Sequence, residues 1–354
     1  MRMGARDKLT QGTMNAHGHT EPLSATRSRG SHTATLRRAV ALLFLSLLAP
    51  LTARAQLVAD SAHVDQPMGD AWWTGPMLAA SPNTLPHGHI LIEPYFFDVH
   101  TENSNFFGNL TYALYGLFDR LTIGSIINSG YAVPDEGPRS SGVGFGDLTL
   151  QASYRLTQFK KGGWVPTTAI VIQETLPTGK FDNLRSRPAD GIGSGAYTTG
   201  IALYGQSYFW LPNHRILRAR VNLTQTFSHS ADIENASVYG TGEGFRGTVK
   251  PGATFAALGA IEYSLTRSWV LALDVQFNRA WNTRVNGFDI TDPQNPNPPS
   301  ILFNSGSRHS FAFAPAIEYS WTPNIGVLLG TRIIPSNPKT THSITPAIAV
   351  NFVR

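Results

Sequence analysis

Polar and apolar residues alternate along most of this chain, and that alternation limits what it can fold into. Between residues 147 and 155 every second residue is polar or charged, and the residues between them are Leu, Ala or Tyr. Successive side chains of a β-strand point to opposite faces, so this pattern predicts a strand with one polar and one apolar face. Twelve segments of 12–16 residues follow it: 88–100, 105–118, 121–132, 143–157, 164–177, 195–210, 214–228, 251–265, 268–280, 307–321, 324–335 and 341–353. They are much longer than the roughly 5–6 residues of an ordinary strand.

The connections between these segments alternate in length. The short ones are 119–120, 157–163, 211–213, 266–267 and 322–323, and the long ones include 178–194, 229–250 and 281–306, which we expect to be loops rich in Gly, Asn, Asp and Pro. Before four of the short connections a Tyr is followed two residues later by a large apolar residue, at Tyr115, Tyr154, Tyr263 and Tyr319. Aromatic residues therefore gather at one level, as in the interfacial girdle of outer-membrane barrels.

The composition favours a barrel in lipid over a soluble sheet. Only 14% of residues are charged, against roughly 25% in a soluble domain. An exposed sheet with so apolar a face would aggregate through its edges. In hydrocarbon every backbone group needs a partner, and only helices or closed barrels provide one. The sequence thus predicts an all-β, transmembrane, antiparallel up-and-down β-barrel of about twelve strands, with short periplasmic turns and longer extracellular loops.

The N-terminus has the pattern of a cleavable signal peptide. Arg37-Arg38 precedes a 13-residue apolar stretch, 39–51, and small residues at Thr52-Ala53-Arg54-Ala55 form an A-x-A-like cleavage site. The expected organisation is a leader at 1–55, a periplasmic N-terminal segment at 56–87 and a transmembrane barrel at 88–354. The expected location is the bacterial outer membrane, reached by signal-peptide export.

The net charge of +5 comes from the leader. Residues 1–55 contain eight basic and two acidic groups, which leaves 20 basic and 21 acidic groups in the remainder. The predicted barrel therefore lacks the basic surface expected of a nucleic-acid-binding protein. The chain has no cysteine, which excludes disulfides, thiol nucleophiles and thiolate metal sites.

The last predicted strand has the alternating apolar residues typical of a barrel assembly signal. They are Ile344, Ile348, Val350 and Phe352, although such signals usually end on the aromatic residue and Val353-Arg354 follow here. The expected partners are outer-membrane lipid, a small-molecule solute and the barrel-assembly machinery, which would bind this strand.

Three motifs resemble a known family. They are 143–150 (V-G-F-G-D-L-T-L), 176–179 (L-P-T-G) and 115–121 (Y-G-L-F-D-R-L). This is similar to the outer-membrane transporters named for the meta-pathway of phenol degradation, over most of residues 88–354. The resemblance implies a β-barrel and the passage of small aromatic or apolar compounds.

We therefore expect a passive channel for small molecules, with no cofactor, metal or covalent chemistry. The alternative is a structural or adhesive barrel that acts through its surface loops. An outer-membrane hydrolase ranks third. Its candidate residues, His229 and His309 with their serine neighbours, fall on the lipid side or in a loop and lack an orienting carboxylate or amide.

The candidate functional residues are those whose polar side chains should face the lumen. Nine are charged, five acidic and four basic, and they either pack the interior as ion pairs or form a selectivity filter. With one amide they are Glu93, Asp147, Gln151, Arg155, Arg218, Arg220, Glu262, Asp274, Glu318 and Arg332.

Residues 56–87 have no strand pattern but contain Trp72 and Trp73. Disordered tails are normally polar, so these tryptophans need a burial site. Two interpretations remain open: the segment plugs the lower opening of the barrel, or the tryptophans lie in the periplasmic headgroup layer.

Overall fold

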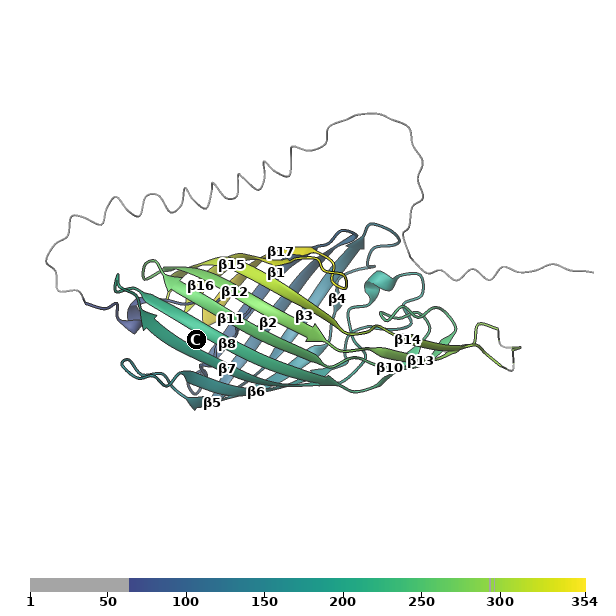
Figure 1. The fold of residues 1–354 in the computed structure, drawn as a ribbon, viewed down its shortest axis with the longest axis horizontal. Coiled ribbons are helices and arrows are strands. Elements are labelled where there is room, and N and C mark those ends of the chain that lie inside the picture. The colour runs from purple at the N-terminus through teal and green to yellow at the C-terminus, as the bar shows by residue number, and fades with distance from the viewer. Residues whose placement is uncertain (1–63, 293, 296) are drawn as a thin grey trace, which may run out of the picture. The chain divides into compact units, whose positions relative to one another are not determined.

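In the computed structural model, which describes residues 64–292, 294–295 and 297–354, twelve antiparallel strands close into a barrel (Figure 1). The predicted leader, its cleavage site and residues 56–63 lie outside this part of the chain. Among the described residues no helix is long and apolar enough to cross a membrane. The helical turns there are η2 (Met68–Asp70) and η3 (Pro188–Asp190).

The barrel strands lie around the wall in chain order, and β1 pairs with β17 to close it. Each lies within or closely overlaps one of the twelve predicted segments. They are β1 (Ile90–His100), β2 (Ser104–Phe118), β3 (Leu121–Pro134), β5 (Leu148–Thr157), β6 (Thr167–Leu176), β7 (Thr198–Trp210), β8 (Ile216–Ser228), β11 (Thr254–Ser264), β12 (Trp269–Ala280), β15 (Arg308–Thr322), β16 (Ile325–Ile334) and β17 (Ser343–Val353).

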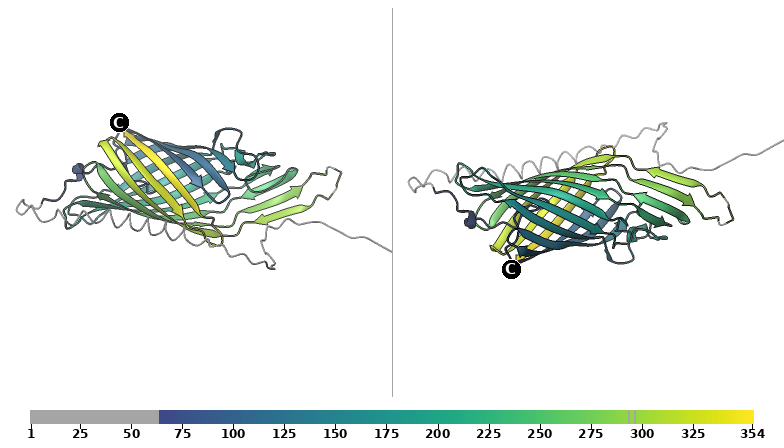
Figure 2. Two further views of the ribbon diagram at one scale, coloured as in Figure 1. Left: turned by 90° about the horizontal axis from the view of Figure 1, so that it is seen from above. Right: turned by 90° about the horizontal axis from the view of Figure 1, so that it is seen from below.

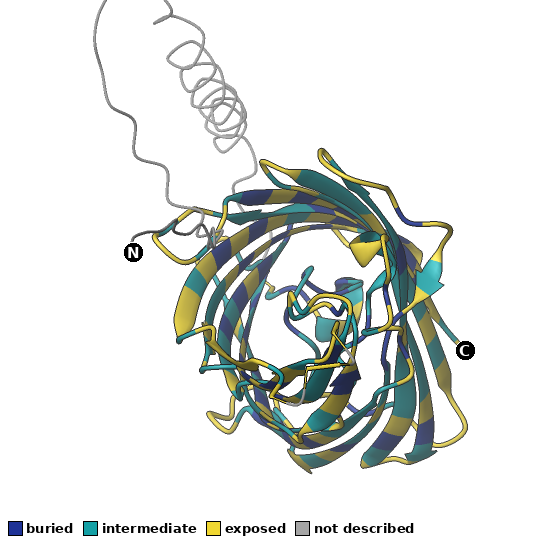
Figure 3. Cartoon of the chain, turned by 90° about the vertical axis from the view of Figure 1, so that its right-hand side faces the viewer, coloured by how far each residue is buried: buried dark blue, intermediate teal, exposed yellow. Residues whose placement is uncertain are grey.

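The polar face of the strands points inward and the apolar face outward. Leu150 and Leu223 are 45% and 40% exposed, as expected for side chains that meet lipid, whereas Glu262 on β11 is completely buried. Figure 3, an end-on view, shows the resulting alternation of buried and exposed stripes around the wall. The prediction of a twelve-stranded up-and-down transmembrane barrel is confirmed.

Two of the predicted loops, 229–250 and 281–306, are more ordered than expected, because they contain strands of their own. These are β9 (Ala231–Glu234), β10 (Phe245–Lys250), β13 (Arg284–Asp289) and β14 (Ser300–Asn304), which form a second sheet in the order β14-β13-β10-β9. The sheet extends beyond the long-loop end of the barrel (Figures 1 and 2). Apolar residues outside the predicted strands stabilise it: Ile233, Phe245, Val249 and Val285 form a buried cluster.

The predicted segment 143–157 is also interrupted. Its first part forms the two-residue strand β4 (Gly144–Phe145), and the regular strand β5 begins only at Leu148. A Cβ on Gly146 would lie 1.7 Å from the Asn128 side-chain oxygen, so a larger residue here would displace the Asn128 amide, which donates to the carbonyl of Asp147.

Candidate functional site

The N-terminal segment enters the barrel lumen and leaves it again at the short-turn end. On the way in, Gln66 N–H donates to the carbonyl of His214 at 2.9 Å and Trp72 N–H donates to the carbonyl of Arg267 at 2.8 Å. On the way out, Leu85 N–H donates to Thr122 Oγ1 at 2.8 Å. His214, Arg267 and Thr122 lie in or beside the short turns, so residues 66–85, here called the lumen segment, form an inserted loop.

An ion pair anchors the beginning of this loop outside the barrel. Asp65 lies 3.1 Å from Lys161 and 3.1 Å from the imidazole of His214, both in short-turn connections. Hydrogen bonds from His214 and Lys161 hold the pKa of Asp65 below its usual value.

Inside the barrel, Glu318 binds the first half of the lumen segment. Its Oε2 accepts hydrogen bonds from Thr74 N–H at 2.9 Å, Thr74 Oγ1 at 2.9 Å and Gly75 N–H at 3.1 Å. Gly75 has φ +116°, which L side chains rarely adopt, and this lets two successive amides reach one carboxylate oxygen.

The tip of the lumen segment is bound by the neighbouring strands. Asp274 Oδ1 accepts from Ala79 N–H at 2.9 Å, Arg220 Nη1 donates to the carbonyl of Ala79 at 2.6 Å, and Asn222 Nδ2 donates to the carbonyl of Ala80 at 3.0 Å. Polar backbone groups that would be costly to bury unpaired are thereby satisfied.

The basic residues of this wall are themselves paired. Arg218 lies directly opposite Glu262 across β8 and β11, and its Nε donates to Glu262 Oε2 at 2.6 Å. Arg220 Nε lies 3.5 Å from the same oxygen and donates to Gln206 at 2.7 Å. Arg218, Arg220 and Glu262 are 5% exposed or less, and pairing lowers the cost of burying charges this far.

The two tryptophans occupy different places. The Arg218 guanidinium lies over the ring of Trp73, 4.4 Å from its centroid, so Trp73 is inside the barrel with the paired charges. Trp72 is at the short-turn end, where the Arg267 guanidinium lies 5.6 Å from its ring centroid.

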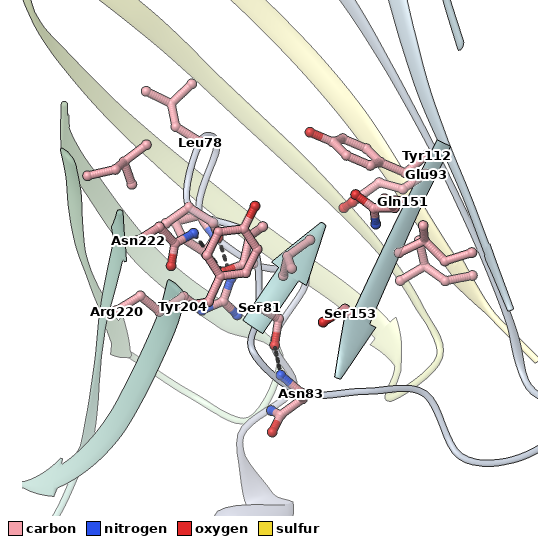
Figure 4. A pocket seen from close by; sticks show the side chains of 18 of the residues that line it. Leu78, Ser81, Asn83, Glu93, Tyr112, Gln151, Ser153, Tyr204, Arg220 and Asn222 are labelled. Atoms are coloured by element: carbon pink, nitrogen blue, oxygen red, sulfur yellow. Dashed lines mark hydrogen bonds between the residues drawn. The ribbon is translucent and has the colours of Figure 1, made fainter. Parts of the chain in front are cut away.

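A cavity of about 270 Å³, here called the lower cavity, lies between the lumen segment and the barrel wall. Figure 4 shows Glu93, Tyr112 and Gln151 grouped on one part of this wall, with Tyr204 and Asn222 on another. Gln151 contacts Gln173 at 3.2 Å, and Glu93 accepts one long hydrogen bond, 3.3 Å, from Asn351. The lining thus combines phenol rings, amides and apolar side chains.

A second cavity, here called the upper cavity, has a volume of about 190 Å³ and lies nearer the long-loop end, behind β1, β2, β16 and β17. Four residues line both cavities: Met77, Leu78, Tyr95 and Tyr112. The two spaces therefore meet where the tip of the lumen segment faces two tyrosines. The upper cavity is otherwise lined by Phe97, Leu110, Arg332, Thr345 and Ala347.

The structure places the ten sequence-predicted residues in four groups. Arg218, Arg220, Glu262, Asp274 and Glu318 form the cluster that contacts the lumen segment, Glu93 and Gln151 line the lower cavity together with Arg220, and Arg332 lines the upper one. Arg155 faces inward near the short turns, opposite Ala169, and lines neither cavity.

Asp147 binds loops and lines neither cavity. Its carboxylate accepts from Gly179 N–H at 2.9 Å, from Ser194 N–H at 2.7 Å and from Ser194 Oγ at 2.6 Å. The break between β4 and β5 removes it from the strand, so it ties the 178–194 connection to the rim.

Sequence reasoning missed the tyrosines Tyr95, Tyr112 and Tyr204, which line the lower cavity. Alternation places each of them on an inward-facing position, but the aromatic residues were assigned to the outer girdle. Inward tyrosines in otherwise polar positions were the signal that could have found them.

Comparison with known proteins identifies the family. The profile of the family described as "Putative MetA-pathway of phenol degradation" matches residues 79–339. The chain belongs to this family. The match covers most of the chain and confirms the resemblance seen in the sequence. No curated protein matches the chain by sequence.

Solved structures share the fold. The COG4313 outer membrane channel from Pseudomonas putida F1 has a TM-score of 0.57 and 12% identity, with 78% of this chain and 98% of that chain covered. The NanC porin gives a TM-score of 0.41 and 9% identity over 74% and 98% of the two chains. The CymD monoaromatic hydrocarbon channel gives 0.40 and 12% over 76% and 89%. All three are named as channels or porins.

Proposed function

We propose that this protein is an outer-membrane channel for the passive passage of small molecules, including aromatic and hydrophobic ones. One observation carries the proposal: two cavities that share lining residues lie along the lumen of a closed barrel, beside the lumen segment. The family description and the outer membrane channel from Pseudomonas putida F1 support it.

The lining suits solutes that are mainly apolar and carry a few polar groups. Tyr95, Tyr112 and Tyr204 offer ring faces and edges for aromatic contacts. The buried Oγ of Ser153 and Oδ1 of Asn222 have no hydrogen-bond partner among the described residues, so both can accept a hydrogen bond from a solute hydroxyl. Passage of this kind involves no covalent step and no cofactor.

The lumen segment restricts this route in our proposal. It is hydrogen-bonded to the wall through β8, β12 and β15, and the lower cavity lies between it and the wall. Export by the leader at 1–55 and insertion by the barrel-assembly machinery through β17 complete the proposed route to the outer membrane.

Solute flux into liposomes that contain the purified protein tests the function. Phenol and a more polar solute of matched size should both enter faster than into protein-free liposomes, with phenol favoured. Equal rates with and without correctly folded protein would contradict the channel.

A second candidate is a structural or adhesive role of the surface sheet. The observation in its favour is that β14 is exposed along its whole length, with Leu302 at 63% and Phe303 at 51%. Shortening 284–304 to a tight turn separates the two candidates: unchanged flux with loss of cell binding would favour adhesion, and lost flux with unchanged cell binding would favour the channel.

A further inference from the structure

Arg332 is an inward-facing arginine without a counter-charge in the part of the chain that the structure describes. Its Nε is inaccessible to solvent and has no hydrogen-bond partner among the described residues. No carboxylate of the described chain forms an ion pair with it at the 4.0 Å limit, whereas Arg218 and Arg220 both contact Glu262. The upper cavity therefore contains one cation that no described carboxylate neutralises.

A second unpartnered group lies beside it. Thr345 is directly opposite Arg332 across β16 and β17, and its buried Oγ1 also lacks a partner among the described residues. Buried polar groups are normally hydrogen-bonded, and an unpaired buried charge is particularly costly. Two adjacent donors without acceptors, both lining one cavity, indicate the place of an anionic group supplied from outside the chain.

The remaining lining of the upper cavity is apolar and aromatic. Phe97, Leu110, Tyr112, Met77 and Leu78 surround the space. The Phe97 ring lies against Gly108 of β2, where an added Cβ would come within 2.3 Å of Phe97 Cζ. Glycine at 108 thus allows the ring to lie back against the wall.

The size of the cavity fits one aromatic ring. Its volume is about 190 Å³, and an apolar cavity of about 150 Å³ is sufficient to take up benzene. A guanidinium binds a carboxylate through two parallel hydrogen bonds, a geometry that lysine cannot reproduce.

From these features we infer that the upper cavity is a binding site for a monoaromatic carboxylate, whose anionic group Arg332 and Thr345 bind while the ring packs against Phe97 and Tyr112. This inference rests on the proposed function, since it names a solute class for the channel. It adds a specificity-determining residue, Arg332, and a defined position for the solute at the long-loop side of the segment tip.

Calorimetric titration of the folded protein in detergent tests the site without requiring transport. The probes are benzoate, the neutral benzamide and the non-aromatic acetate. The wild-type protein should bind benzoate at least tenfold more tightly than either of the other two. In R332Q the affinity for benzoate should fall at least tenfold, to the level of benzamide. R155Q, which removes an inward arginine that lines neither cavity, is the matched control and should retain wild-type binding.

R332K keeps the positive charge and loses the geometry for two parallel hydrogen bonds. It is the second variant, in case R332Q fails to fold. It should bind benzoate with intermediate affinity. Folding of every variant is checked by the different gel migration of heated and unheated samples. Equal benzoate binding by wild type and R332Q would overturn the inference, and so would acetate binding as tight as that of benzoate. Benzoate binding without flux of any solute would instead overturn the channel function alone.

Discussion

Replacement of Glu318 by alanine should release the lumen segment from the barrel wall. Glu318 Oε2 is the shared acceptor for three donors of Thr74 and Gly75, and the side chain is completely buried. Without it, two backbone amides and a hydroxyl lose their partner inside the barrel. In the withdrawn state the same donors are free to bond water, so the substitution weakens only the inserted state.

The magnitude follows from the hydrogen bonds. A typical hydrogen bond contributes a net of about 0.5–1.5 kcal/mol. The three bonds share one oxygen and are not additive, so we assign about 2–4 kcal/mol to their joint loss. At about 1.4 kcal/mol per factor of ten, the ratio of inserted to withdrawn segment should fall roughly 30- to 1,000-fold.

Two measurements report this change. In planar bilayers, E318A should show larger or more frequent open events than the wild type. Because the chain contains no cysteine, L78C introduces a unique thiol at the tip of the segment. A membrane-impermeant thiol reagent should label this position faster in the E318A background.

E174A provides the matched control for the removal of a carboxylate. Glu174 lies on the outward face of β6, where it accepts from Thr199 Oγ1 at 2.7 Å and has no contact with the lumen segment. It should leave conductance and labelling unchanged. If folded E318A also behaves like the wild type in both assays, Glu318 does not hold the segment and our reasoning fails.

Further outcomes are expected elsewhere in the molecule. L223R should lower the free energy of unfolding by about 2–4 kcal/mol, because the arginine then faces lipid opposite Leu203 and Ala257, and Q151R should cost less; equal losses in urea titrations would contradict the assigned faces. Heated and unheated protein should migrate differently on detergent gels, and identical migration would argue against a closed barrel. E93Q should shift the reversal potential in a salt gradient towards anions, because it removes a lumen carboxylate with no ion pair; an unchanged potential would exclude Glu93 from the route. The pKa of Asp65 lies below its usual value of 3.8, so its bonds stabilise the fold above that pH and are lost as the pH falls through the lowered pKa. The fluorescence of the tryptophans should follow this loss in the wild type. A D65N variant with the same acid response would refute the prediction.

The sequence predicted the barrel well because its physical signal is local. Each strand has one face towards lipid and one towards the polar lumen, so its apolar and polar residues must alternate with period 2. Every barrel strand carries this pattern. The face assignments of Leu150 and Gln151 follow directly from it. The second sheet was not predicted because β9, β10, β13 and β14 are only four to six residues long and lie among turn-forming residues.

The contacts of the lumen segment depend on distances that the sequence does not contain. Thr74 and Glu318 are 244 residues apart, and neither shows by itself that the other is its partner. The sequence did indicate that Trp72 and Trp73 needed burial and that the lumen charges nearly balanced. It could not indicate that the lumen segment both buries a tryptophan and binds the charged residues of one barrel wall.

Pairing, more than the number of charges, determines what a solute meets in this lumen. A count of five acidic and four basic inward residues suggests a nearly neutral interior without selectivity. In the structure Glu262 forms ion pairs with both Arg218 and Arg220 beside the lumen segment, while Glu93 and Arg332 line the cavities without ion pairs among the described residues. Substitutions in the paired cluster should therefore change how often the segment withdraws. Substitutions of Glu93 or Arg332 should change which solutes pass, and their effects should not be additive with those of E318A, because the segment that E318A releases lines both cavities.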